Sequence, residues 1–137
     1  MLQVKLIVAG SRTITDKPFI YTVIEEHLNY LNSYNILQDL KTYKDLIIVS
    51  GCAKGVDSVA LDWAQENNVK YEEYLAQWIN ERGIRDLSAG FKRNKKMALN
   101  STHLLAIWDG KSRGTSHMIE TMEALDKNIL IVRYSND

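Results

Sequence analysis

Short apolar runs alternate with longer segments of helical periodicity along nearly the whole chain of 137 residues. Apolar residues gather in β-rich runs at 4–9, 46–49, 70–75, 104–108 and 129–132. Apolar residues at helical spacing lie between these runs, at 20–31, 56–64, 89–100 and 115–125. Strands that are apolar throughout are typical of a parallel sheet with helices on both faces. We therefore predict one Rossmann-like three-layer α/β domain over residues 1–137, with a mostly parallel five-stranded sheet in the order 3-2-1-4-5.

The composition excludes several other classes of protein. Lysine plus arginine and aspartate plus glutamate each number 17, and this zero net charge argues against a dedicated binder of duplex DNA. A hydrophobic fraction of 45% argues against a disordered chain. No apolar run approaches the ~20 residues of a membrane span. Since the first residues do not resemble a signal peptide either, we expect a cytoplasmic protein with no membrane partner.

Glycines lie just after the first, second and fourth predicted strands, at Gly10, Gly51, Gly55, Gly110 and Gly114. In open α/β sheets the ligand crevice lies beyond the carboxyl ends of the strands, here between the first and fourth strands. Glycine lets backbone amides approach an anion closely, and a helix N-terminus adds free donors. These loops are predicted to hold phosphate and ribose groups, and their convergence favours this interpretation over the alternative that the glycines only turn the chain. No Walker or GxGxxG motif occurs, which disfavours an ATPase or an ordinary dehydrogenase.

Four strings of residues follow one another in the chain: AGSR at 9–12, SGCAKGVD at 50–57, AGFKRNKKM at 89–97 and GKSRGT at 110–115. Together they resemble the SLOG superfamily, which includes LOG-type phosphoribohydrolases, the DNA-processing Smf/DprA proteins and short stand-alone proteins of the YspA type. The short type is the most similar, and the resemblance covers nearly the whole chain. It implies a Rossmann-like domain that binds a nucleotide or nucleotide derivative at these loops, and a homo-oligomer.

The sequence departs from the LOG-type enzymes at a position that bears on catalysis. Those enzymes carry a glutamate three residues after the Gly-Thr pair, and this glutamate contributes to cleaving the bond between base and ribose. Met118 stands at that place, after Gly114-Thr115. We therefore expect binding rather than hydrolysis by the LOG route, with Asp57 and Asp109 as the carboxylates available to an enzyme.

Several side chains near the predicted crevice are candidates for contacts with the ligand. Arg12 directly follows the first strand, where a guanidinium could hold a phosphate or carboxylate with two hydrogen bonds. Asp57 lies in the first turn of the second predicted helix, where it could accept a ribose hydroxyl or order the loop amides. The resemblance implies that Arg93 and Asn94 point into the site.

The other charged and reactive residues are given less weight. Lys92, Lys95 and Lys96 share one face of the 89–100 helix, which is most simply a solvated face. Trp78 and Trp108 could stack bases of single-stranded nucleic acid, but each is more often a core or interface residue. Cys52 lies beside a helix start, an environment that can lower a thiol pKa, yet no histidine is placed nearby.

Histidines, cysteine and carboxylates show no metal-ligand spacing, so neither a metal nor a cofactor is expected. The protein is predicted to bind a phosphorylated nucleoside derivative as a sensor or sequestering protein. The alternatives are an N-glycosidase or ribosyl-transfer enzyme acting on nucleotides, and a module that binds single-stranded nucleic acid through the cations of residues 92–96. Nucleic acid is the less favoured partner. The residues predicted to contact the ligand are Gly10, Ser11, Arg12, Ser50, Gly51, Cys52, Ala53, Lys54, Gly55, Asp57, Arg93, Asn94, Asp109, Gly110, Ser112, Arg113, Gly114 and Thr115.

Overall fold

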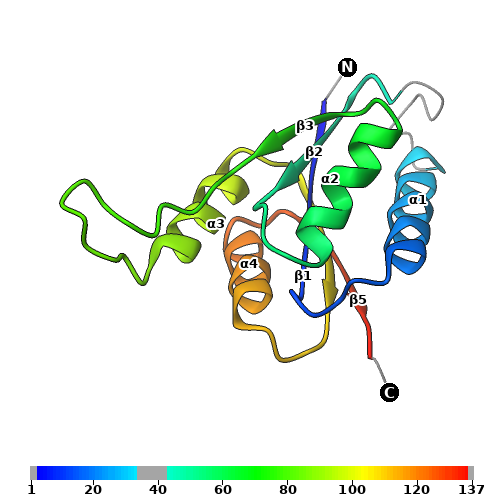
Figure 1. Cartoon of the computed structure of the whole chain (residues 1–137). Coiled ribbons are helices and arrows are strands. Elements are labelled where there is room, and N and C mark those ends of the chain that lie inside the picture. Colours follow the sequence, from blue (N-terminus) through cyan, green and yellow to red (C-terminus); the bar gives the residue numbers. More distant parts are fainter. Residues whose placement is uncertain (1–2, 34–42, 136–137) are drawn as a thin grey trace.

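A computed structural model describes residues 3–33 and 43–135 of the chain. Strands and helices alternate along the chain (Figure 1). In chain order they are β1 (Val4–Gly10), α1 (Lys17–Ser33), β2 (Leu46–Ser50), α2 (Val56–Glu66), β3 (Lys70–Glu73), α3 (Ala89–Leu99), β4 (His103–Trp108), α4 (Arg113–Ala124) and β5 (Asn128–Arg133). The strands form one sheet in the order β3-β2-β1-β4-β5, and every neighbouring pair is parallel. The predicted fold class and strand order are confirmed.

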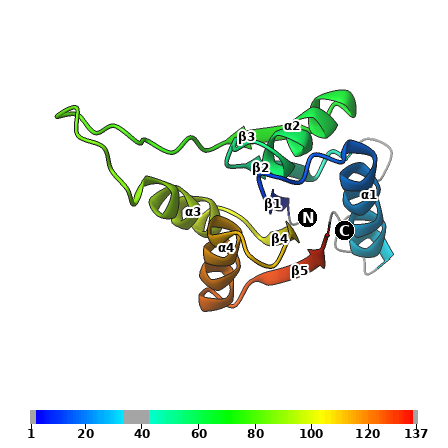
Figure 2. The same cartoon turned by 60° about the horizontal axis from the view of Figure 1, so that its bottom comes forward.

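The sheet separates two layers of helices. Helices α1 and α2 pack against each other on one face, and α3 and α4 pack against each other on the opposite face (Figure 2). The central strand β1 alternates between these layers, because Leu6 and Val8 belong to one core cluster and Ile7 and Ala9 to the other. Two apolar cores, one on each face, therefore hold the strand ends that carry the glycine loops in fixed positions.

Helix α1 shows how local sequence signals set an element. Its first backbone amides lack helical partners, and Asp16 Oδ1 accepts a hydrogen bond from the Phe19 amide at 3.2 Å. Pro18 fits in the first turn, where no amide donor is needed. The side chains of the predicted apolar face that are buried are Ile20, Ile24, His27, Leu28 and Leu31.

Three expectations are wrong in detail at the margins of the fold. The sheet is not covered on both faces throughout: on the outer strand β5, Leu130 is 39% and Ile131 is 41% exposed. An edge strand has a neighbouring strand on one side only, and β5 pairs with β4 alone. Leu125, expected on the apolar face of the last helix, follows the end of α4 and is 37% exposed. Strand β3 ends at Glu73, so Leu75 lies outside the sheet and is exposed.

Residues 74–88 leave the body of the domain and return to it as a protruding arm, which both views show extending beyond α3 (Figures 1 and 2). The sequence predicts 77–88 as irregular, and the arm contains no helix or strand. It is nevertheless ordered by an antiparallel bridge between Ile79 and Arg85. Within the described ranges of the chain, no helix has the length and apolar character needed to cross a membrane.

Candidate functional site

A cavity of about 270 Å³ lies where the loops after β1, β2 and β4 meet helix α3. We call it the cradle cavity. Its walls are formed by Ala9, Gly10, Arg12, Ala53, Asp57, Arg93, Asn94, Met97, Ser112, Gly114, Thr115 and Met118. The strand order reverses between β1 and β4, because the chain first adds β2 and β3 on one side of β1 and then adds β4 and β5 on the other side. The cavity therefore lies at the topological switch point, where open α/β sheets place ligands.

Half of the predicted contact residues line this cavity and half do not. Those at the wall are Gly10, Arg12, Ala53, Asp57, Arg93, Asn94, Ser112, Gly114 and Thr115. Those placed behind or beside it are Ser11, Ser50, Gly51, Cys52, Lys54, Gly55, Asp109, Gly110 and Arg113. The loops that carry the sequence motifs therefore form part of the wall of this cavity, while the residues of the second group do not line it.

Arg93 connects helix α3 to the loop after β2. Its Nη1 donates to the carbonyl oxygen of Gly51 at 2.6 Å, and its Nε donates to Asn94 Oδ1 at 3.1 Å. A Cβ at residue 51 would lie 3.0 Å from both the Arg93 guanidinium and Asp57 Oδ2. Glycine at position 51 thus allows an arginine and a carboxylate to approach the same point of the loop.

Asp57 is buried at the start of α2 and faces the cradle cavity. Its Oδ2 accepts a hydrogen bond from the Ala53 amide at 3.3 Å, so it orders the loop as the sequence suggested. Burial raises the pKa of Asp57 to about 6, although the Ala53 amide and the Arg93 guanidinium oppose this shift. A carboxyl group of this kind can gain or lose a proton near neutral pH.

Asn94 ties the two helices of this face together. Its Nδ2 donates to the carbonyl oxygen of Gly114 at 3.2 Å and lies 3.2 Å from His117 Nδ1. The imidazole of His117 is stacked on Phe91, with 4.0 Å between ring centroids, and its pKa is lowered by burial. The first turn of α4, whose N-terminal amides have no partner within the helix, is thereby held against the cavity.

Two of the predicted glycines are required by the protein's own packing. A Cβ at Gly10 would clash with the carbonyl oxygen of Ile107 and with Val56. At Gly55 φ is +79°, and a Cβ would clash with the backbone of Ser11 and Arg12. Close contact between the loops, rather than access for a ligand, explains these two residues.

The loop after β4 is held by Asp109, which does not line the cavity. Its Oδ1 accepts hydrogen bonds at 2.8 Å from the amides of Lys111 and Ser112, and these bonds lower its pKa. The Asp109 amide in turn donates to Ser11 Oγ at 3.0 Å. Asp109 therefore shapes the loop that begins α4, and Asp57 is the carboxylate at the cavity wall.

Cys52 does not have the environment of a reactive thiol. It has a φ of +63°, and Glu73 Oε2 lies 3.5 Å from its Sγ. Burial and the carboxylate of Glu73 raise the thiol pKa above its ordinary value, whereas a nucleophilic cysteine needs a lowered one. The helix start does not overcome these two effects.

The apolar part of the cavity wall was missed by sequence reasoning. Ala9, Met97 and Met118 line it, and Met118 is 1% exposed. Helical periodicity indicates a core position for Met118, but it does not say which buried residues border a cavity. Met118, which the resemblance aligns with the LOG-type glutamate, faces the cavity.

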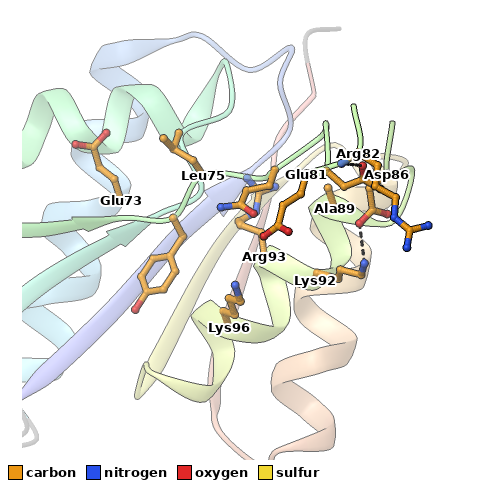
Figure 3. A pocket seen from close by; sticks show the side chains of 12 residues that line it. Glu73, Leu75, Glu81, Arg82, Asp86, Ala89, Lys92, Arg93 and Lys96 are labelled. Carbon is orange, nitrogen blue, oxygen red and sulfur yellow. Dashed lines mark hydrogen bonds and ion pairs between the residues drawn. The ribbon is translucent and has the colours of Figure 1, made fainter. Parts of the chain in front are cut away.

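A second, more open hollow of about 700 Å³ lies between α3 and the arm (Figure 3). We call it the arm groove. Lys92, Arg93 and Lys96 line it from α3, and Lys92 forms an ion pair of 2.6 Å with Asp86 of the arm. All three lysines of the predicted solvated face are exposed, but two of them border this groove. Arg93 lines both hollows. In the part of the chain that the structure describes, no cluster of side chains could hold a metal ion.

A family model described as YAcAr, the YspA, cpYpsA-related SLOG family, matches residues 4–80, which is more than half of the chain. The chain belongs to this family. No curated protein sequence matches this YAcAr protein. The family match covers the loops after β1 and β2, including Arg12 and Asp57, and ends before α3.

Solved structures show the same fold at low sequence identity. DNA processing protein A (DprA) from Streptococcus pneumoniae matches with a TM-score of 0.71 and 19% identity, covering 98% of the YAcAr chain and 52% of that protein. DNA processing protein A from Helicobacter pylori, which has a unique single-stranded DNA binding mode, matches with a TM-score of 0.64 and 16% identity, covering 99% of this chain and 68% of that one. The protein TM1055 matches with a TM-score of 0.60 and 16% identity, covering 93% and 72%. The YAcAr chain thus spans about half the length of the S. pneumoniae protein.

Proposed function

We propose that this protein binds a phosphorylated nucleoside derivative in the cradle cavity and acts as a sensor or sequestering protein in the cytoplasm. The observation that carries the proposal is the meeting of Arg12, Arg93 and the first turn of α4 at one cavity on the switch point of the sheet. Guanidinium groups and helix N-terminal amides are the donors that proteins use for phosphate.

The donors of Arg93 suit such a ligand. A guanidinium has five N–H groups, and Arg93 uses two of them for Gly51 and Asn94. These two bonds fix the orientation of the group, and the remaining donors are enough for a phosphate contact through two oxygens. The match to a SLOG family also supports a nucleotide-related ligand, because the resemblance to the SLOG superfamily implies a domain that binds a nucleotide or nucleotide derivative.

An enzyme of the N-glycosidase or ribosyl-transfer class is the alternative at the same cavity. It would need a carboxylate near the anomeric carbon, and Asp57 is the carboxylate at the wall. Met118 supplies no acid or base where the LOG-type enzymes have glutamate. We favour binding without turnover for this reason.

One experiment separates these possibilities. The protein is titrated by calorimetry with AMP, ribose 5-phosphate and inorganic phosphate, and the AMP mixture is then analysed by chromatography for free adenine. Saturable binding of AMP with no adenine supports the proposal. Release of adenine that is lost in Asp57→Asn would show an enzyme, and no binding of any of the three at millimolar concentration would contradict the proposal.

Single-stranded nucleic acid is the second candidate, and the cations that line the arm groove are the observation in its favour. Arg82, Lys92, Arg93 and Lys96 line this groove, but Glu73, Glu81 and Asp86 line it too. This mixture of charges disfavours a polyanion. A fluorescence titration with a short oligodeoxythymidine at several salt concentrations tests it, because phosphate contacts produce a steep loss of affinity with salt.

A further inference from the structure

A third hollow, of about 350 Å³, lies beside the cradle cavity and is lined by Arg12, Trp78 and Arg85. Arg12 also lines the cradle cavity, so the two hollows share a wall. The indole of Trp78 is 38% exposed although the side chain is large and apolar. A partly exposed tryptophan that lines a hollow together with two arginines is the arrangement of a surface that receives a planar, electron-rich group.

Trp78 lies next to the phosphate donors of the cradle. A Cβ at Gly90 would lie 3.3 Å from the Trp78 ring and 3.9 Å from Arg93 Nη2, so both side chains approach the same point of α3. Glycine is unfavourable within a helix, and the close packing of the indole explains its presence at position 90. The ring therefore stands within reach of a molecule whose phosphate contacts Arg93.

The arm holds the indole in this position. The Trp78 carbonyl accepts a hydrogen bond of 2.7 Å from the Asp86 amide, next to the bridge between Ile79 and Arg85. At the tip, Asn80 Oδ1 accepts hydrogen bonds from the amides of Arg82 and Ile84. The Arg85 guanidinium lies over the Trp78 ring, 5.9 Å from its centroid. The indole of Trp78 is thus held in place by the two paired segments of a closed, hairpin-like loop.

The size of the cradle cavity also indicates that part of a nucleotide would lie outside it, near Trp78. About 270 Å³ is at or below the lower end of small-molecule sites, which suits a ribose phosphate better than a whole nucleotide. The base of a nucleotide bound there would extend past Arg12 or Arg93. On that side it meets the hollow of Trp78 and Arg85.

We infer that Trp78, which lines this hollow together with Arg85 and Arg12, is the base-recognition surface of the ligand site, and that the base stacks on the indole. This inference rests on the proposed function, because it assumes a phosphate in the cradle. It assigns a role to the protruding arm, and it predicts that the ligand carries an aromatic base rather than a sugar phosphate alone.

The test compares AMP with ribose 5-phosphate, which differ by the base. Calorimetry on the wild type is expected to give about tenfold tighter binding of AMP, as a single base-aromatic stack provides. Trp78→Ala should bind both ligands with the affinity of ribose 5-phosphate, and Trp78→Phe should keep most of the preference for AMP. Ile84→Ala, an exposed apolar residue of the same arm that lines none of these hollows, is the matched control and should behave as the wild type.

Fluorescence gives an independent readout. AMP is expected to quench tryptophan emission, ribose 5-phosphate is not, and Trp78→Phe should abolish the quenching. An equal loss of affinity for both ligands in Trp78→Ala, or an unchanged preference for AMP, would overturn the inference while leaving the proposed phosphate site intact. Failure of both ligands to bind the wild type would contradict the proposed function itself and the inference with it.

Discussion

Arg93 Nη1 donates to the carbonyl oxygen of Gly51 across 2.6 Å, which joins helix α3 to the loop that carries Asp57. Arg93 is therefore both a ligand-facing residue in our proposal and a structural link between two elements. From the sequence alone one would expect an arginine that faces an anion to make few contacts within the protein. The structure assigns it two hydrogen bonds before any ligand is considered.

Replacing Arg93 by alanine should affect both binding and stability. Loss of a charge-assisted bond to phosphate lowers the affinity for AMP about ten- to a hundredfold, roughly 1.5–3 kcal/mol. The carbonyl of Gly51 also loses its donor, so the free energy of unfolding without ligand should fall by about 1–3 kcal/mol. Calorimetry and urea unfolding measure the two effects.

Lys95→Ala is the control for the charge change, because Lys95 is exposed on the same helix and lines neither the cradle cavity nor the arm groove. It should change neither quantity appreciably. If both variants weaken AMP binding equally, diffuse electrostatics and not a phosphate contact would account for the affinity.

Asp57→Asn tests the buried carboxyl. The folded-state pKa of about 6 lies above the ordinary 3.8, so ionisation costs folding free energy once the pH rises past these values. The variant should be more stable than the wild type by up to about 3 kcal/mol at pH 7.5, and this gain should disappear as the pH falls from 6 to 4. The asparagine oxygen can still accept the Ala53 amide.

Urea unfolding at several pH values measures this difference, with Asp62→Asn on the exposed side of α2 as the control. The control should stay within about 0.5 kcal/mol of the wild type at every pH. A stability difference for Asp57→Asn that does not depend on pH would show that the carboxyl is not held with a raised pKa.

Gly114→Ala separates ligand access from packing. A Cβ at this position in the first turn of α4 meets no heavy atom within 4 Å, yet the residue lines the cradle cavity. The methyl group should therefore stabilise the helix by a few tenths of a kcal/mol, since alanine is the better helix former. AMP should bind several-fold more weakly, because the methyl occupies space beside the anion.

Gly10→Ala is the contrasting variant. Its Cβ would clash with the Ile107 carbonyl oxygen, so the loss should be of stability, seen as a lower melting temperature. A destabilised Gly114→Ala, or one with unchanged AMP affinity, would count against an anion at the start of α4.

The sequence alone predicts the fold and the loops near the cavity, but not the full cavity wall or the contacts of individual side chains. Apolar periodicity predicted the strands and helices, and the doubly wound fold class that they indicate supplied the strand order and so the loops at the switch point. The cavity wall provided by Met97 and Met118 was not visible, since burial by itself does not reveal a neighbouring hollow. Asp109 and Cys52 could not be judged either, because their roles depend on the amides of Lys111 and Ser112 and on the carboxylate of Glu73.

His27 is a buried polar residue whose role lies outside the site. Among the described residues neither of its ring nitrogens has a hydrogen-bond partner, and burial, with a smaller contribution from His103, lowers its pKa to about 4. The folded protein then resists protonation that the unfolded chain accepts, so stability should be lost as the pH falls from about 6.5 to 4. His27→Leu should raise the free energy of unfolding by about 1–3 kcal/mol at pH 7 and flatten this acid dependence. Urea unfolding at pH 7 and pH 5 checks both effects, and an unchanged acid slope would show that another group causes it.

The central claim is that a nucleoside phosphate occupies the cradle cavity, and a crystal structure of the protein soaked with AMP tests it most directly. Our account predicts the phosphate within hydrogen-bond distance of Arg93 and of the amides that begin α4, at the wall formed by Gly114 and Thr115. Ordered AMP found only outside the cradle cavity, at a soak concentration well above its dissociation constant in solution, would contradict the account.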